Sequence, residues 1–285
     1  MTESTEPTLV VTGATGRLGG RVARRLAERG LAQRLLVRSP ERAPRLPGAA
    51  PVRGSYEDRD AAVRALGGAK TLLMVSAAEN VDRLSQHRAF VDAAVEAGVE
   101  HLVYVSFFGA APDAVFTLAR DHFHTEEHIR RSGLAYTFLR DNIYADFVPA
   151  LVGEDGVIRG PAGQGRAAFV AQDDIADAAA AVLTRPADHA GDTYDLTGPE
   201  SLTLDEAAAV LSQVEGRTVT YRPETVEEAY ASRATYGAPQ WQLDAWVSTY
   251  TAIAAGQLDG VSDAVPRLTG RPATSLTDVV RATLR

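Results

Sequence analysis

The stretch TLVVTGATGRLGG, residues 8–20, decides how the chain folds. Residues 8–12 form a short apolar run with two valines, which is typical of a buried strand. Residues 17–29 then repeat an apolar side chain every fourth position, which places one apolar face on a helix. Three of the glycines in the turn and at the start of the helix, Gly13, Gly16 and Gly19, recur at every third position. The stretch therefore predicts a strand, a glycine-rich turn and a helix in direct succession.

The three glycines have the spacing of a turn that holds phosphate groups. Gly13 permits the tight turn out of the strand, Gly16 lets the backbone approach a pyrophosphate, and Gly19 lets the helix lie close to the strand. The free N–H groups at the helix N-terminus attract the negative charge of the phosphates. Because a strand precedes the turn and a helix follows it, the motif has the context that it requires. The sequence therefore predicts a dinucleotide site at this turn.

The next hundred residues repeat the alternation of strand and helix. Apolar runs at 34–38, 71–76, 101–106 and 136–140 predict strands, and the segments 58–66, 80–97 and 119–132 predict helices. Strands that are apolar throughout are buried on both faces, which indicates a parallel sheet covered by helices. Right-handed crossovers then give a doubly wound α/β fold of the Rossmann type.

The regular alternation weakens after about residue 142. Residues 153–165 hold five glycines and a proline, which is typical of a loop or a sharp hairpin near a ligand. Further helices are predicted at 173–183 and 204–213, strands at 193–196 and 218–221, and helices over the remainder. We expect a dinucleotide-binding domain over residues 1–150 and a smaller C-terminal substrate-binding lobe over residues 151–285, with some of its segments returning to the Rossmann sheet.

Composition and charge exclude several classes of partner. The formal net charge of the 285 residues is −8, and an acidic surface repels nucleic acid and anionic membranes. The chain has no cysteine, so disulfides, thiolate metal sites and cysteine nucleophiles are excluded. Residues 1–7 lack the features of a signal peptide, and no apolar run is long enough to span a membrane. We expect a cytoplasmic protein, either a monomer or a homodimer, that binds no nucleic acid and no membrane.

The end of the second predicted strand bears on the choice of cofactor. NAD enzymes usually place an acidic residue there to bind the ribose 2′-hydroxyl, but this chain has Arg38 in the segment VRSP, residues 37–40. A guanidinium at that point can pair with the 2′-phosphate of NADP through two hydrogen bonds, and Arg17 in the glycine turn can assist. The alternative is that Arg38 stacks on the adenine or is solvated. The arginine favours NADP, with NAD possible.

These features, with the segment HFHTEEHIRRSGLAYTFLRDNIY at 122–144, resemble a known family. The chain is similar to the atypical short-chain dehydrogenases of the NmrA-like group, and especially to the type 2 NAD(P)H:quinone oxidoreductases. The resemblance covers nearly the whole chain, including SLTLDEAAAVLSQVEGRTVTY at 201–221. It implies an oxidoreductase that transfers a hydride from NAD(P)H to a quinone or to another flat polycyclic aromatic carbonyl compound.

The resemblance also implies which residues meet the cofactor and the substrate. The adenine and phosphate side would meet Gly13, Thr15, Gly16, Arg17, Leu18 and Arg38, and the ribose and nicotinamide side would meet Ser76, Ala77, Ser106 and Phe107. The loop Asn142-Ile143-Tyr144 would complete the nicotinamide pocket, and His122 lies where related reductases hold a catalytic basic group. Imidazole titrates near neutral pH, so His122 is a candidate proton donor beside Asn142 and Tyr144. The alternative for His122 is a structural hydrogen bond to the backbone.

Two further patterns limit the chemistry. His124 and His128 share a helix face in the string HTEEH, but the glutamate and the third ligand of a zinc site are missing, so no metal is expected. Tyrosine and lysine four residues apart, the usual proton relay, are also missing, and the only lysine, Lys70, precedes a strand on the side away from the expected site. A quinone needs little acid catalysis, because aromaticity stabilises its reduced form.

Two other functions remain open at this point. One is a tailoring enzyme for aromatic natural products, including an oxygenation. The other is a redox sensor of the NmrA-like type, which binds the dinucleotide and a protein partner without catalysis. A substrate-sized pocket would distinguish an enzyme from a sensor, because a sensor needs none.

Overall fold

The computed structural model describes residues 7–284. The chain divides into two compact units, each assembled from separate stretches. The first comprises the chain up to Ser106, His124–Leu139 and Ile175–Tyr194, and the second comprises Phe107–Phe123, Arg140–Asp174 and the chain from Asp195 onward. The sequence predicts a boundary near residue 150, with some later segments returning to the Rossmann sheet, and the two units alternate along the chain. The alternation arises because the stretches that leave the C-terminal ends of the late strands of the sheet belong to the second unit.

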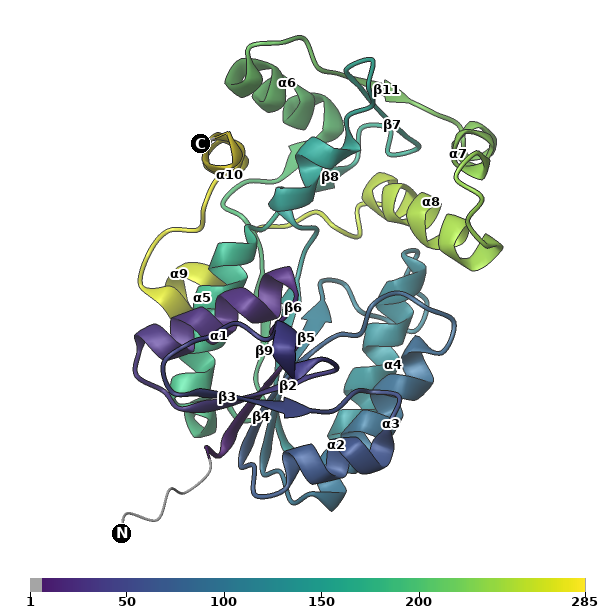
Figure 1. The fold of residues 1–285 in the computed structure, drawn as a ribbon. Helices are drawn as coiled ribbons and strands as arrows, with labels where there is room; N and C mark the ends of the chain where they lie inside the picture. The colour runs from purple at the N-terminus through teal and green to yellow at the C-terminus, as the bar shows by residue number, and fades with distance from the viewer. Residues whose placement is uncertain (1–6, 285) are drawn as a thin grey trace. The chain divides into compact units, whose positions relative to one another are not determined.

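The first unit is built around a seven-stranded sheet with the order β3-β2-β1-β4-β5-β6-β9 (Figure 1). Its strands are β1 (Leu9–Thr12), β2 (Gln33–Val37), β3 (Ala49–Arg53), β4 (Thr71–Val75), β5 (His101–Phe107), β6 (Ala135–Asp141) and β9 (Thr193–Leu196). β1 pairs in parallel with β2 on one side and with β4 on the other, so that Val11 lies opposite both Leu35 and Leu73. The strand order therefore reverses at β1, and ligands of such sheets bind beside this point at the carboxyl ends of the strands.

Helices cover both faces of this sheet (Figure 1). They are α1 (Arg17–Glu28), α2 (Arg59–Leu66), α3 (Arg83–Glu96), α4 (Thr117–Arg131) and α5 (Gln172–Thr184), with α1 and α5 on one face and α2, α3 and α4 on the other. The Nε atom of Arg25 on α1 lies 2.9 Å from Oδ1 of Asp177 on α5. Leu72, Met74 and Phe90 are buried in the core on the opposite face. The doubly wound α/β fold that the sequence predicts is confirmed.

The edge strand β3 is one element that the sequence does not predict. Its segment AAPVR contains Pro51, and none of its residues is buried. A proline cannot donate a hydrogen bond to a neighbouring strand, so it is tolerated at the edge of a sheet. The parallel register of β3 with β2 leaves the other side of β3 unpaired within this sheet.

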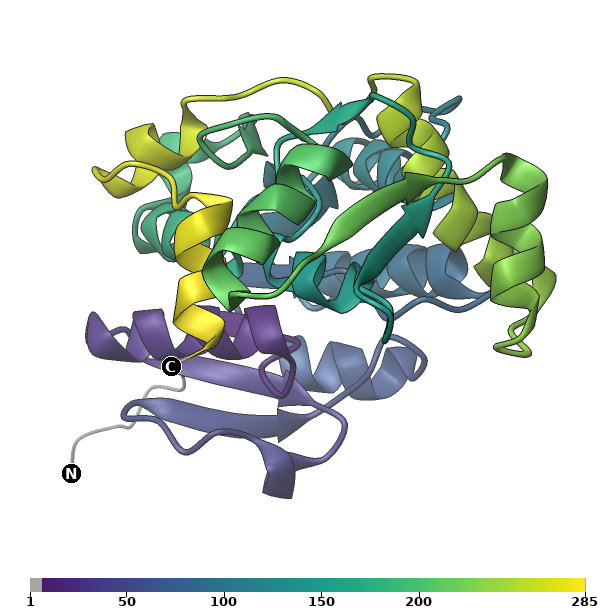
Figure 2. The ribbon, with the colours of Figure 1, turned by 90° about the horizontal axis from the view of Figure 1, so that it is seen from above.

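The second unit contains two short strand pairs and several helices. β7 (Val157–Gly160) pairs in parallel with β11 (Thr220–Pro223), and β8 (Arg166–Ala167) pairs with β10 (Leu202–Thr203) in antiparallel orientation. The helices are α6 (Leu204–Glu215), α7 (Val226–Ala234), α8 (Gln240–Ala254), α9 (Ala264–Thr269) and α10 (Leu276–Thr283), and three short 3-10 turns are η1 (Pro40–Arg42), η2 (Ala145–Leu151) and η3 (Pro186–His189). η1 and η3 belong to the first unit, whereas η2 belongs to the second. Figure 2 shows α6 and α10 side by side, and both contribute to one apolar core.

Between residues 7 and 284, no helix combines the length and the apolar character that a membrane span requires.

Candidate active site

The glycine turn brings backbone atoms closer together than any side chain would allow. Gly13 follows β1 directly and has a φ of +67°, a conformation that favours glycine. The N–H of Gly16 donates to the carbonyl oxygen of Gly13 at 2.9 Å. A Cβ atom on Gly19 would lie 2.4 Å from that same oxygen, so only glycine fits there. No side chain caps α1 at Gly16, and this exposed cradle of N–H groups fits the phosphates of a dinucleotide.

A cavity of about 200 Å³ lies at the carboxyl ends of β1, β2 and β4. Five of the predicted cofactor residues line it, namely Gly13, Thr15, Arg38, Ser76 and Ala77. Gly16 and Arg17 are exposed at the start of α1, whereas Leu18 and Gly19 are buried inside that helix. The side chain of Leu18 therefore packs in the core, and only its backbone is placed to meet a phosphate.

Tyr56 is a residue of this cavity that the sequence does not single out. Its hydroxyl donates to the carbonyl oxygen of Val75 at 2.6 Å and lies 2.7 Å from Oγ1 of Thr12. The N–H of Val75 in turn donates to Thr12 Oγ1 at 2.9 Å. Burial raises the pKa of Tyr56, so its hydroxyl stays protonated. The three residues form a closed set of hydrogen bonds that ties β1 to β4 beneath the cavity.

Two side chains of α3 hold the backbone of Ala77, at the turn after β4. The N–H of Ala77 donates to Nε2 of His87 at 2.9 Å, and Arg83 Nε donates to the carbonyl oxygen of Ala77 at 3.0 Å. Because Nε2 accepts, the proton of the neutral imidazole is on Nδ1, which lies 3.0 Å from Oγ1 of Thr125. His87 is fully buried, and burial, assisted by the charge of Arg83, lowers its pKa to about 3. The wall of the cofactor cavity is thus fixed by a neutral histidine.

The low pKa of His87 predicts that the stability of the fold depends on pH. An unfolded histidine has a pKa near 6.5, so the stabilisation is complete above about pH 6.5 and is lost as the pH falls towards 3. Between pH 7.5 and pH 5 we expect this residue to lower the free energy of unfolding by about 2 kcal/mol. Urea denaturation over this range measures the loss, and His87→Gln should flatten it. An unchanged slope in the variant would contradict the assignment.

Two residues of the segment HTEE at 124–127, Thr125 and Glu126, are buried polar side chains on α4. Ser106 Oγ at the end of β5 donates to Oε1 of Glu126 at 2.6 Å, and Arg130 Nη2 donates to Oε2 of the same carboxylate at 3.0 Å. Thr125 and Glu126 are both fully buried. Ser106, a predicted cofactor residue, is therefore held by a carboxylate from α4.

The two histidines with zinc-like spacing lie on α4, His124 in the middle of the helix and His128 near its end. His128 Nε2 lies 2.7 Å from Oδ1 of Asp92 on α3. In the described part of the chain, no group of three or more His, Cys, Asp or Glu side chains is arranged to hold a metal ion.

The three candidate catalytic residues belong to the second unit. His122 is buried, with its ring centroid 6.0 Å from that of Phe107. Asn142 is also buried, and its amide donates to the carbonyl oxygen of Leu258 at 3.0 Å and accepts from the N–H of Ile143 at 2.8 Å. The Tyr144 hydroxyl donates to Asp141 Oδ2 at 2.7 Å. These contacts favour a role for Asn142 in fixing the loop after β6.

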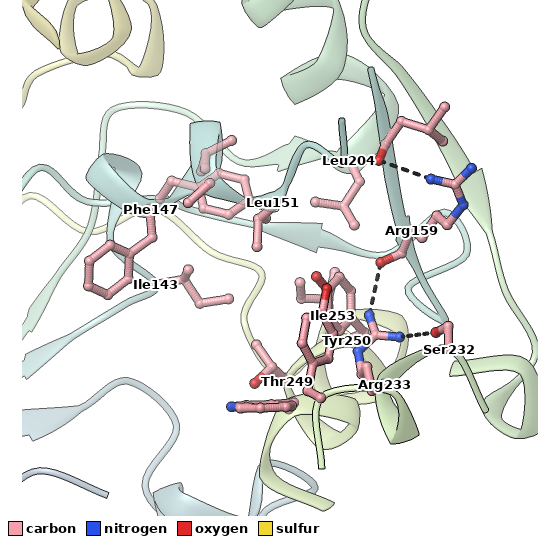
Figure 3. A pocket seen from close by; sticks show the side chains of 17 residues that line it. Ile143, Phe147, Leu151, Arg159, Leu204, Ser232, Arg233, Thr249, Tyr250 and Ile253 are labelled. Carbon is pink, nitrogen blue, oxygen red and sulfur yellow. Dashed lines mark hydrogen bonds between the residues drawn. The ribbon is translucent and has the colours of Figure 1, made fainter. Parts of the chain in front are cut away.

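The second unit contains a cavity of about 550 Å³ with a largely apolar wall (Figure 3). Four of its residues, Trp246, Thr249, Tyr250 and Ile253, form a stripe along α8 at intervals of three, one and three positions. Further residues of the wall are Ile143, Phe147, Leu151, Phe169 and Tyr236, together with the charged Arg159 and Arg233. Of the loop Asn142-Ile143-Tyr144, Ile143 is the member that reaches the wall. The size and the aromatic rings suit a flat, drug-sized molecule.

Glycines of the segment 153–165 shape this cavity. A Cβ atom on Gly160 would lie 2.2 Å from Cδ1 of Tyr250, and one on Gly165 would lie 2.0 Å from the carbonyl oxygen of Ile253. Both glycines therefore let α8 approach β7 and the loop that follows it. The segment contains the strand β7 as well as the loop that the sequence predicts.

Comparison with known proteins agrees with this geometry. The sequence model of the NAD(P)H-binding family matches residues 13–186. The chain is 32% identical over 279 residues to the NAD(P)H azoreductase of Xenophilus azovorans, covering 96% of this chain and 97% of that protein. It is 34% identical over 280 residues to quinone oxidoreductase 2 of Escherichia coli, covering 95% and 97% of the two chains. The crystal structure of the latter with NADPH superimposes with a TM-score of 0.89 at 33% identity, covering 97% of this chain and 100% of that chain. The chain therefore belongs to the NAD(P)H-binding family, and quinone oxidoreductase 2 of Escherichia coli is among its relatives.

Proposed function

We propose that this protein is an NAD(P)H-dependent reductase of quinones and other flat aromatic acceptors, and that NADPH is its preferred cofactor. The aromatic cavity of about 550 Å³ is the observation that carries the proposal, because a sensor would need no such cavity. The azoreductase and quinone oxidoreductase names of the two relatives support the same class of acceptor. Flat conjugated rings are common to both kinds of compound.

The residues of the first unit fit the cofactor. When bound, the nicotinamide would supply a hydride, which is the chemistry of the cofactor itself. The glycine turn would hold the pyrophosphate at the start of α1, and Arg38 would lie at the adenosine ribose. His87 and Arg83 would keep the Ser76–Ala77 turn in one conformation against the cofactor.

The residues of the second unit would bind and orient the acceptor. Trp246, Tyr250 and Phe147 offer flat faces on which an aromatic ring can stack, and an apolar wall keeps water away from the reacting atoms. The chain has no lysine available for a proton relay, because Lys70 lies at the amino ends of the strands, where its ammonium pairs with Glu100. A quinone can be reduced without such a relay, because its ring becomes aromatic on reduction and the resulting oxyanions take up protons readily.

Replacement of Trp246 tests where the acceptor binds. We expect Trp246→Ala to raise KM for naphthoquinone by about tenfold, because one stacking face and its apolar contact are lost. NADPH affinity should stay within about twofold, since Trp246 does not line the cofactor cavity. Steady-state NADPH oxidation over a panel of quinones gives both values.

The other tryptophan of the chain provides the matched control. Trp241 precedes Trp246 on α8 and is not part of the cavity wall, so Trp241→Ala should keep KM close to the wild-type value. Equal effects of the two substitutions would place the acceptor elsewhere. The absence of NADPH oxidation with every quinone of the panel would contradict the proposed function itself.

A further inference from the structure

The cavity of the second unit carries two positive charges in an otherwise uncharged wall. Arg159 and Arg233 lie together at one end of it (Figure 3). A guanidinium in such a wall usually binds an anionic group of a ligand. Here each guanidinium is paired with a carboxylate of the chain that does not line the cavity, Asp155 for Arg159 and Glu224 for Arg233.

The pair of Arg233 and Glu224 is shielded from water. Nη1 of Arg233 lies 3.0 Å from Oε2 of Glu224, and the two side chains are only 11% and 7% exposed. Two further contacts hold the guanidinium, because Nη1 lies 3.2 Å from Ser232 Oγ and Nη2 donates to the carbonyl oxygen of Arg159 at 3.0 Å. The guanidinium carbon lies 4.9 Å from the ring centroid of Tyr250, which is another residue of the wall. The charge of Arg233 is therefore balanced by Glu224, which does not line the cavity, while the flat face of the guanidinium lies over the ring of Tyr250.

The pair of Arg159 and Asp155 is different in kind. Both oxygens of the Asp155 carboxylate bind the guanidinium, but the side chains are 34% and 54% exposed. Water screens a pair of this sort, so it contributes little to the potential inside the cavity. The carboxylate of Glu224 is thus the one of the two that water screens less, so its charge acts more strongly on the cavity.

We infer that Glu224 is the residue that determines the charge preference of the acceptor site: its buried pair with Arg233 keeps the cavity neutral, so that the protein selects uncharged aromatic acceptors over anionic ones. The inference rests on the proposed function, since it takes the cavity to be the acceptor site. Loss of the Glu224 carboxylate leaves an unbalanced guanidinium in a wall of low polarity, where attraction to an anion is strong. The sulfonate of an anionic ring can then pair with the guanidinium of Arg233, whereas an uncharged ring has no group that forms such a pair.

Direct binding tests this without any turnover. In a Trp241→Phe background the only tryptophan is Trp246, in the cavity wall, and quenching of its fluorescence reports on binding there. In this background we expect naphthoquinone to bind about tenfold more tightly than naphthoquinone sulfonate. Glu224→Gln should tighten the sulfonate by about tenfold and leave naphthoquinone within about twofold.

Two variants make the test specific. Asp155→Asn removes a carboxylate from the exposed pair and should change both affinities by less than about threefold. Arg233→Gln leaves Glu224 without its partner, so the sulfonate should bind about tenfold more weakly than to the background protein. If Glu224→Gln does not fold, this opposite shift in Arg233→Gln carries the test.

The results that overturn the inference are distinct from those that overturn the proposed function. Preference of the background protein for the sulfonate, or an affinity ratio unchanged in Glu224→Gln and Arg233→Gln, would refute the role of Glu224. Quinone binding that follows the expected pattern without any NADPH oxidation would refute the reductase and leave the charge preference standing.

Discussion

Gly19→Ala is expected to lower the affinity for NADPH by about a hundredfold or more. The added Cβ would lie 2.4 Å from the carbonyl oxygen of Gly13 and 2.7 Å from that of Thr12, so α1 must move away from the turn. Movement of the turn weakens several hydrogen bonds to the pyrophosphate together, and each hydrogen bond to a charged group is worth about 1.5–3 kcal/mol. Fluorescence titration with NADPH measures the loss, and urea denaturation reports the expected fall in stability of about 1–3 kcal/mol.

Gly67→Ala is the matched control for this substitution. Gly67 ends α2 with a φ of −49°, and a Cβ there would come no closer than 3.4 Å to a backbone oxygen. The control should bind NADPH and unfold as the wild type does. Unchanged NADPH affinity in Gly19→Ala would mean that the glycine turn does not hold the pyrophosphate.

Arg38→Ala should lower NADP affinity by about tenfold to a hundredfold and leave NAD affinity nearly unchanged. Arg38 is exposed in the wall of the cofactor cavity at the end of β2, where the ribose 2′-position is expected. A charge-assisted hydrogen bond to the 2′-phosphate is worth about 1.5–3 kcal/mol, and NAD has no such group. Arg38→Asp should go further, because its carboxylate repels NADP and accepts a hydrogen bond from the 2′-hydroxyl of NAD.

Binding titrations with both dinucleotides check this prediction. Arg42→Ala, on the nearby turn η1 and outside the cavity wall, should leave both affinities as in the wild type. If the wild type binds NAD and NADP equally and both weaken alike in Arg38→Ala, the arginine stacks on the adenine and does not select the phosphate.

The strands and helices of the sheet were predictable because their sequence pattern reports local burial. β1, β2 and β5 are buried on both faces and contain apolar runs, and this is the signature of a covered parallel sheet. The glycine turn was predictable for a related reason, since the positive φ of Gly13 and the close packing around Gly19 favour glycine at these positions. β3 carries neither signal, because none of its residues is buried and its only strand partner in the sheet is β2. The pairing of β7 with β11 joins residues 63 positions apart, such as Val157 and Thr220, and no local pattern reports it.

The support of the cofactor cavity could not be predicted in the same way. The sequence predicts the helix that contains Arg83 and His87, but helical periodicity marks apolar positions and gives no partner for a buried polar side chain. Which backbone groups these residues bind depends on the path of the turn after β4. Tyr56 likewise follows β3, a strand that the sequence does not predict. The hydrogen bonds of its hydroxyl go to Thr12 and Val75, which lie far from it along the chain.

The cavity of the second unit corresponds to a sequence pattern whose meaning local reasoning could not decide. Trp246, Thr249, Tyr250 and Ile253 have the spacing of one helix face. Such a stripe packs against a core in most helices, and nothing in its periodicity separates a core from a cavity. The distinction depends on what lies opposite, here η2 and β7, and on the small size of Gly160.

The stoichiometry of NADPH oxidation under anaerobic conditions tests the central claim most directly. The protein is mixed with NADPH and excess naphthoquinone in the absence of oxygen, and the oxidised cofactor and the hydroquinone are both quantified. A reductase that passes a hydride to the acceptor predicts one hydroquinone formed for each NADPH consumed, over many turnovers. Tight binding of NADPH with no hydroquinone formed, or oxidation that requires oxygen, would contradict the account.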